Sequence, residues 1–234
     1  MTKRIIFVGD SITEGKIGIG YVDIIQHRFP EFRCQNYGRG GDTLSGIFTS
    51  LFKILKTDIE YCDVIVIEAG HNDLFLPYVK KKWKFRSIRK ITPLNNIKDF
   101  YDNGLRMISL HSKAKIILTT LSCLGEDINS PINQKRRFVN DQIKEVGSKH
   151  GVYIADVSSS FDKILRKSIS TYNLLNHPFN LPLDYFRSKR LNGVEKISRK
   201  RKLMLTIDGG HLNYKGAMIY VREISRILDT LSAL

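Results

Sequence analysis

Short runs of consecutive hydrophobic residues alternate along the chain with longer stretches in which hydrophobic residues recur every three or four positions. Short runs are typical of strands buried on both faces of a sheet, and the spaced stretches are typical of helices that bury one face. The pattern predicts five strands, at Ile5–Val8, Arg33–Tyr37, Asp63–Ala69, Lys115–Leu121 and Val152–Val157.

Helical spacing fills the intervals between these strands. It predicts helices around residues 21–29, 47–55, 97–108, 138–146 and 217–231. Pro30 and Gly151 end the first and the fourth, Thr92 and Pro93 begin the third, and Phe138 belongs to the apolar stripe of the fourth. Alternating strands and helices indicate an α/β fold, with a five-stranded parallel sheet covered by helices on both faces.

The composition is that of a globular protein, with 42% hydrophobic and 26% charged residues, and we expect one domain over residues 1–234. The three cysteines form no C-x-x-C pair, which favours free thiols in a reducing compartment. No apolar run approaches the ~20 residues of a transmembrane helix. The apolar run near the N-terminus stops at Gly9, too soon for a signal peptide, so we expect a cytoplasmic protein.

The net charge of +15 is concentrated in two short segments. Residues 80–90 carry seven Lys or Arg and no acid, and residues 187–202 carry eight Lys or Arg and one acid, so each contributes +7 and the rest of the chain +1. Like charges at this density repel one another, which favours loops or lids over packed elements. We therefore expect a basic loop at about 78–91 and a basic insertion at about 160–207.

Residues suited to acyl transfer follow the predicted strands, at the sheet edge where α/β proteins bind ligands. Ser11 comes just after the first strand, and Asp208 and His211 precede the last helix. A serine hydroxyl needs a base such as His211 to accept its proton, and Asp208 can orient that imidazole. The backbone amides of Ser11 and Gly41 and the side-chain amide of Asn72 are candidates for an oxyanion hole.

Four segments in this order resemble the four conserved blocks of the SGNH, or GDSL-type, hydrolase family. They contain the following matches: Gly9-Asp10-Ser11, Gly41, Gly70-x-Asn72-Asp73 and Asp208-x-x-His211. The resemblance covers about residues 3–157 and 205–232. It implies a flavodoxin-like α/β/α fold and hydrolysis or transfer of esters, with no metal and no organic cofactor.

The interpretation that follows is a serine esterase or acylhydrolase that forms an acyl-enzyme on Ser11. Removal of an acetyl group from a sugar and deacylation of a lipid both remain open, as does the oligomeric state. Asp10, His71 and Trp83 are possible substrate-binding residues, although Asp10 is also explained as loop scaffold and His71 as a pocket-rim or packing residue. An acyltransferase with the same site, or a non-catalytic module that binds anionic partners, is the alternative.

The basic segments flank the Asn72 and Asp208 blocks in sequence, so they could form a positive rim for an anionic substrate or surface. A solvated, solubilising surface explains them equally well. Aromatic residues among the cations also suit peripheral contact with an anionic membrane. Nucleic-acid binding is not favoured, because no recognised nucleic-acid-binding fold accompanies the charge.

Overall fold

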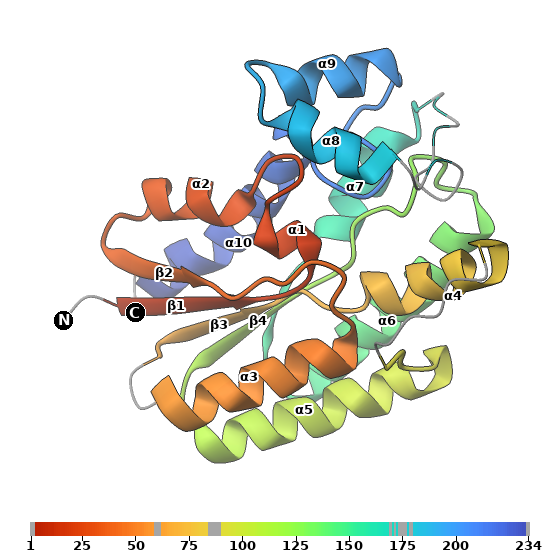
Figure 1. The fold of residues 1–234 in the computed structure, drawn as a ribbon. Coiled ribbons are helices and arrows are strands. Elements are labelled where there is room, and N and C mark those ends of the chain that lie inside the picture. The colour runs from red at the N-terminus through yellow and green to blue at the C-terminus, as the bar shows by residue number, and fades with distance from the viewer. Residues whose placement is uncertain are drawn as a thin grey trace.

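The computed structural model describes residues 3–58, 62–83, 90–168, 170, 172, 177 and 180–232. Five parallel strands form one sheet in the order β2-β1-β3-β4-β5 (Figure 1). The strands are β1 Lys3–Val8, β2 Phe32–Asn36, β3 Val64–Ile67, β4 Lys115–Thr119 and β5 Tyr153–Ala155. The predicted α/β class and the five-stranded parallel sheet are confirmed.

Helices cover both faces of the sheet and also extend beyond its carboxyl edge (Figure 1). In chain order they are α1 Ser11–Glu14, α2 Tyr21–Arg28, α3 Leu44–Asp58, α4 His71–Trp83, the 3₁₀ helix η2 Leu94–Asn96, α5 Ile97–His111, α6 Pro131–Lys149, α7 Val157–Leu165, α8 Asn180–Ser188, α9 Gly193–Lys200 and α10 Tyr214–Ser232. No helix in the described part of the chain is both long and apolar enough to span a bilayer.

Alternate residues of each strand pack against different helix layers, as the two-residue period of a strand requires. In β1, Ile5 and Phe7 face a core formed with α2, α7 and α10, whereas Ile6 and Val8 face a core formed with α3, α5 and α6. Because both faces of the sheet are buried, the strands appear in the sequence as continuous apolar runs, and they were predicted from these runs.

Two helices differ in detail from the sequence prediction. Phe138 of α6 is 50% exposed, whereas its neighbour Val139 is fully buried. The buried stripe of this helix runs from Val139 through Ile143, so Phe138 lies one position away from it. The third predicted helix begins at Ile97 rather than at Pro93, since the intervening residues form η2.

Most of the described residues in both basic segments are helical, where loops or lids were expected. Lys80 and Lys81 continue α4, and most of the second segment lies on α8 and α9. The reason lies in the spacing of a few apolar residues: Val194 and Ile197 share one face of α9 and pack against Ile207, while the cations point to solvent.

The predicted insertion at 160–207 is partly core. Phe161 and Leu165 of α7, four positions apart, are buried in the layer that α7 shares with α10. The segment 203–207 also contributes buried residues to the protein interior, including Leu205 and Ile207. Among the described residues, the structure added beyond the three layers is therefore centred on α8 and α9.

Candidate active site

Ser11 lies on a sharp turn at the carboxyl end of β1. Asp10 caps the single turn of α1, since its Oδ1 accepts a hydrogen bond of 2.9 Å from the backbone N–H of Ile12. Gly15 ends that turn in a left-handed conformation with φ of +68°, which a residue with a side chain rarely adopts. These local features place the Ser11 side chain on the wall of a pocket.

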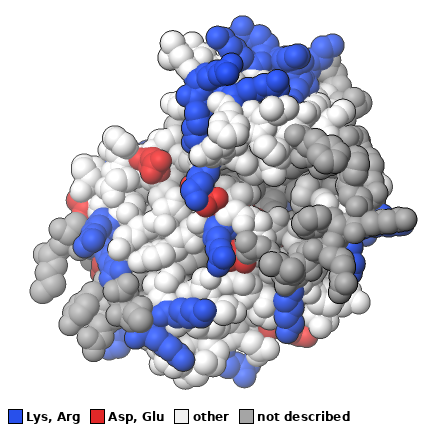
Figure 2. All heavy atoms as spheres, in the orientation of Figure 1, with Lys and Arg blue, Asp and Glu red and all other residues white. Residues whose placement is uncertain are grey.

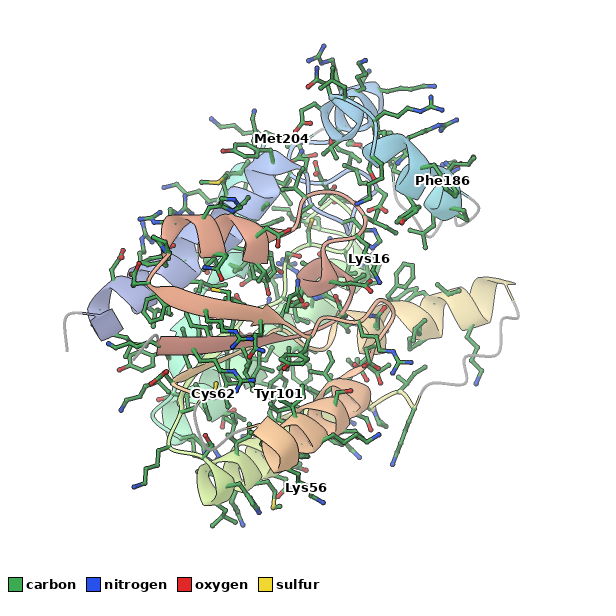
Figure 3. All side chains as sticks on the ribbon, turned by 60° about the vertical axis from the view of Figure 1, so that its left-hand side comes forward. Lys16, Lys56, Cys62, Tyr101, Phe186 and Met204 are labelled. Atoms are coloured by element: carbon green, nitrogen blue, oxygen red, sulfur yellow. The ribbon has the colours of Figure 1, made fainter. Side chains whose placement is uncertain are left out.

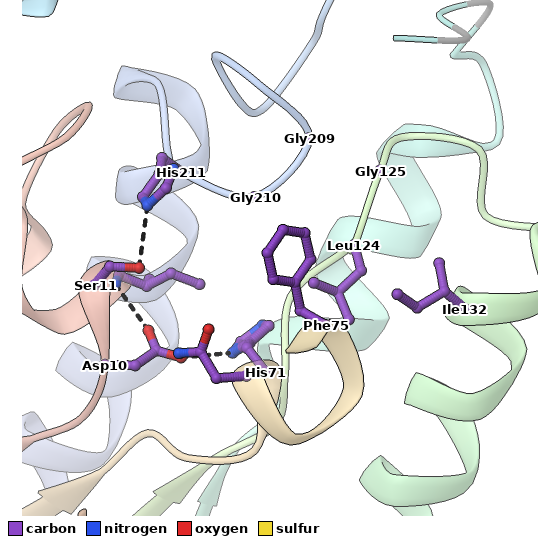
Figure 4. Close-up of a pocket in the computed structure, with 12 residues that line it drawn as sticks. Asp10, Ser11, His71, Phe75, Leu124, Gly125, Ile132, Gly209, Gly210 and His211 are labelled. Carbon is purple, nitrogen blue, oxygen red and sulfur yellow. Dashed lines mark hydrogen bonds and ion pairs between the residues drawn. The ribbon is translucent and has the colours of Figure 1, made fainter. Parts of the chain in front are cut away.

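The structure brings together the three residues that the sequence nominated for catalysis, of which Figure 4 shows Ser11 and His211. His211 Nε2 lies 3.1 Å from Ser11 Oγ, and His211 Nδ1 lies 2.7 Å from Asp208 Oδ2. Asp208 Oδ1 also accepts the backbone N–H of His211 at 2.8 Å. The three groups form a hydrogen-bonded row in which the base lies between the hydroxyl and the orienting carboxylate.

The Asp208–His211 pair is buried and is stabilised in its charged form. Burial by itself lowers the pKa of His211, but the Asp208 carboxylate more than offsets this and the net pKa is raised above its usual value. Burial raises the pKa of Asp208, whereas His211 and two backbone N–H groups lower it, and the net pKa is lowered. His211 is therefore a stronger base than an isolated histidine.

Two of the three predicted oxyanion donors are backbone N–H groups. Among the residues that the structure describes, no acceptor is found for the backbone N–H of Ser11 or of Gly41. Gly41 has φ of +71°, a conformation that favours glycine at this position. A methyl group at the adjacent Gly40 would lie 4.0 Å from Ser11 Cβ, so this loop borders the Ser11 turn.

The third predicted donor, Asn72, already donates two hydrogen bonds within the protein. Its Nδ2 donates to the backbone oxygen of Asp42 at 2.8 Å and to Asp10 Oδ2 at the longer distance of 3.2 Å. An oxyanion would therefore replace the longer of these two bonds. Asp10 holds Asn72 in position and caps α1, which is the scaffold role that the sequence offered as one explanation for it.

A second chain of hydrogen bonds lies beside the first, and sequence reasoning missed two of its three members. His71 Nδ1 lies 2.7 Å from Glu68 Oε1, and His71 Nε2 lies 3.1 Å from Ser122 Oγ. Glu68 and Ser122 are fully buried, and His71 is 4% exposed on the pocket wall. A carboxylate at the end of the apolar run before Gly70 was the one signal that could have revealed Glu68.

Glu68 and Asp10 belong to the same buried cluster. Burial, reinforced by the negative charge of Glu68, raises the pKa of Asp10 well above its usual value, and burial also raises the pKa of Glu68. Burial lowers the pKa of His71, which favours its neutral form. Potential ligand atoms of these three residues lie within 4.8 Å of one another. We assign them to hydrogen bonding, because His71, Thr13 and Asn72 already occupy the carboxylate oxygens.

Glu126 holds the loop that carries Asp208 and His211, and no sequence pattern pointed to it. It is fully buried, and its carboxylate accepts the backbone N–H groups of Met204, Leu205 and Thr206 at 2.7–2.9 Å, as well as the Thr206 hydroxyl at 2.8 Å. These bonds connect the segment after β4 to the loop before α10. They fix the position of the base relative to the sheet edge.

The pocket beside Ser11 is small, with a volume of about 60 Å³. Its polar wall is formed by Ser11, His211, His71, Asp10 and Asn72. Its apolar wall comes from Ile12, Phe75, Leu124 and Ile132 (Figure 4). Gly125, Gly209 and Gly210 complete the lining. The side chain of Trp83, the remaining candidate for substrate binding, lies outside the described residues.

A parallel α/β sheet with a Ser–His–Asp arrangement at its carboxyl edge defines a class of serine hydrolases. The family model for the GDSL-like lipase/acylhydrolase family matches residues 7–217. The chain therefore belongs to the GDSL-like lipase/acylhydrolase family, and it is an ester-hydrolysing enzyme. This confirms the resemblance that the four sequence segments indicated.

Solved structures share the fold at low sequence identity. An α/β hydrolase from the metagenome of Lake Arreo, Spain, is 18% identical with a TM-score of 0.66, over 96% of this chain and 94% of that one. The acetyl xylan esterase AlAXEase is 21% identical with a TM-score of 0.64, over 96% and 98%. A lipolytic G-D-S-L family protein from Veillonella parvula is 15% identical with a TM-score of 0.63, over 96% and 97%. No curated protein sequence matches the chain significantly.

Proposed function

We propose that the protein is a serine esterase that removes short acyl groups, acetyl above all, through an acyl-enzyme on Ser11. The observation that carries this proposal is the hydrogen-bonded order Ser11–His211–Asp208 on the wall of a pocket. Asp208 and His211 stabilise each other, so the imidazole is oriented before substrate arrives.

In the proposed reaction, His211 Nε2 accepts the proton of Ser11 Oγ as this oxygen attacks the ester carbonyl carbon. The carbonyl oxygen becomes an oxyanion facing the backbone N–H groups of Ser11 and Gly41, with Asn72 as the third donor. The ester bond then breaks, and the imidazolium gives its proton to the leaving alcohol. A water molecule, deprotonated by His211, attacks the acyl-enzyme; the bond to Ser11 Oγ breaks, the acid is released, and His211 returns the proton to Ser11 Oγ.

The size of the pocket supports a short acyl group. A cavity needs ~10–15 Å³ of such volume to hold one water molecule, so about 60 Å³ accommodates only a few atoms of that size. The apolar side chains of Phe75, Leu124 and Ile132 suit a methyl group. The acetyl xylan esterases among the structural neighbours support an acetylated sugar as the substrate class.

A series of p-nitrophenyl esters tests the proposal, with acetate, butyrate and octanoate compared at equal concentration. We expect kcat/KM to be highest for acetate and to fall as the chain lengthens, and we expect Ser11→Ala to abolish hydrolysis of all three. Preference for octanoate would contradict the short-acyl proposal. Hydrolysis of none of the esters by correctly folded protein would favour the binding-module alternative.

A further inference from the structure

The α8–α9 pair presents a dense positive surface to solvent, visible as the blue region at the top of Figure 2. Residues 180–202 contain eight Lys or Arg and two acids. One of the acids, Asp184, is buried and binds Arg201 through two hydrogen bonds of 2.7 and 2.9 Å. The remaining cations have no ion-pair partner within the described residues; they are Arg187, Lys189, Arg190, Lys196, Arg199, Lys200 and Lys202.

Four of these cations converge on one open groove between α8 and α9. The groove is lined by Arg187, Arg190, Lys196 and Lys200, together with Leu191. Guanidinium and ammonium groups gathered around one hollow match the chemistry of phosphate groups. The charge is therefore arranged to meet several anionic groups at once.

Large apolar side chains are exposed in the same short segment. Leu191 is 86% exposed, Phe186 67% and Leu183 49%. Phe186 projects from α8 away from the body of the protein (Figure 3). Polyanions such as nucleic acids and charged glycans offer phosphates or carboxylates but no hydrocarbon phase for leucine. A bilayer of anionic phospholipids offers both.

The surface is firmly attached to the part of the chain that carries the base. Val194 and Ile197 pack on Ile207, and Arg201 Nη1 donates to the Ile207 backbone oxygen at 2.7 Å. Ile207 directly precedes Asp208. The α8–α9 pair therefore forms a fixed platform beyond the carboxyl edge of the sheet (Figure 1).

We propose that the α8–α9 pair docks the protein on bilayers that contain anionic phospholipids. The four groove cations contact the lipid phosphates, and Phe186 and Leu191 enter the interfacial region. This binding is separate from ester hydrolysis and does not depend on which ester is the substrate.

Co-sedimentation with vesicles tests the proposal, with phosphatidylcholine alone compared with phosphatidylcholine plus phosphatidylglycerol. We expect binding only to the anionic vesicles, and we expect added salt to weaken it because exposed charges are screened. Arg187→Gln with Arg190→Gln should weaken partitioning about 30-fold, from the typical contribution of one Lys or Arg near an anionic surface. Leu191→Ser should weaken it at least about tenfold through lost apolar burial.

Matched variants away from this surface serve as controls. Lys113→Gln with Lys115→Gln removes two exposed charges at the start of β4, and Leu110→Ser removes a leucine that is 71% exposed on α5. We expect these variants to bind as the wild type does, and all variants to keep their melting temperature and p-nitrophenyl acetate hydrolysis.

Three results would overturn the proposal: no binding to anionic vesicles, equal loss in the control variants, or binding that ignores Leu191→Ser. The last result, together with salt-sensitive binding to RNA, would identify a soluble polyanion as the partner instead.

Discussion

The pocket is bordered by two Ser–His–carboxylate chains whose distances are the same. Ser11–His211–Asp208 and Ser122–His71–Glu68 both show 3.1 Å between serine and histidine and 2.7 Å between histidine and carboxylate. They differ in access and in charge. Ser11 lines the pocket, whereas Ser122 is fully buried, and the pKa of His211 is raised whereas that of His71 is lowered. Distances alone therefore do not distinguish a nucleophile from a scaffold.

The carboxylates explain why the two histidines differ. Asp208 accepts the backbone N–H groups of Gly210 and His211, at 3.0 and 2.8 Å, and its lowered pKa keeps it charged next to the imidazole. Glu68 instead shares its buried site with Asp10, and the pKa of both is raised. An anion beside His211 favours the imidazolium that the proposed reaction forms, whereas His71 stays neutral. We infer that the Glu68 chain positions residues beneath the pocket.

The largest expected effect separates the two serines. Ser11→Ala should lower kcat by ~10⁴-fold or more, as removal of a nucleophile does in triad enzymes, and should abolish labelling by a fluorophosphonate probe. Ser122→Ala removes the buried hydrogen bond to His71 and should leave labelling intact and kcat within about threefold of the wild type. Steady-state kinetics and mass spectrometry of the labelled peptide measure both. Labelling that survives in Ser11→Ala but disappears in Ser122→Ala would reverse the assignment.

An intermediate effect is expected at Asn72, whose Nδ2 donates to Asp10 Oδ2 and to the backbone oxygen of Asp42. Asn72→Ala should lower kcat ~10²-fold with little change in KM, because an oxyanion donor acts mainly in the transition state. Initial rates with p-nitrophenyl acetate over a range of concentrations separate kcat from KM. A raised KM at unchanged kcat would make Asn72 a substrate-binding residue.

The smallest effect at neutral pH is expected from His71, and the pH profile distinguishes it from His211. Only neutral His211 can accept the Ser11 proton, so kcat/KM should fall on the acid side. Because the pKa of His211 is raised, the midpoint should lie above the usual histidine value of about 6.5. Asp208→Asn removes the anion that raises this pKa, so the midpoint should move to lower pH in the residual activity. His71→Gln should leave the midpoint in place, and loss of the acid limb in that variant would transfer the role of base to His71.

Much of the fold followed from local patterns, because both faces of the sheet are buried and the strands are continuous apolar runs. The same holds for α10, whose stripe from Ala217 to Leu231 is buried in the structure. Ser11, Asp208 and His211 were also recognisable in the sequence, because they belong to short motifs. The spacing of residues within such a motif does not depend on how the rest of the chain packs. Sequence alone therefore determined the class of fold and nominated the residues that the structure brings to one pocket.

Contacts between segments that are distant in the sequence depend on the tertiary structure and could not be predicted from local patterns. The second chain joins Glu68 and His71 after β3 to Ser122 after β4, and these segments meet only because the two strands are neighbours in the sheet. In the second basic segment, the helix α9 depends on the packing of Val194 and Ile197 against Ile207, which outweighs the screened repulsion among its exposed cations. The difference between the pKa values of His71 and His211 likewise exists only in the folded chain, because burial lowers both and only beside His211 does a carboxylate, Asp208, more than offset that effect.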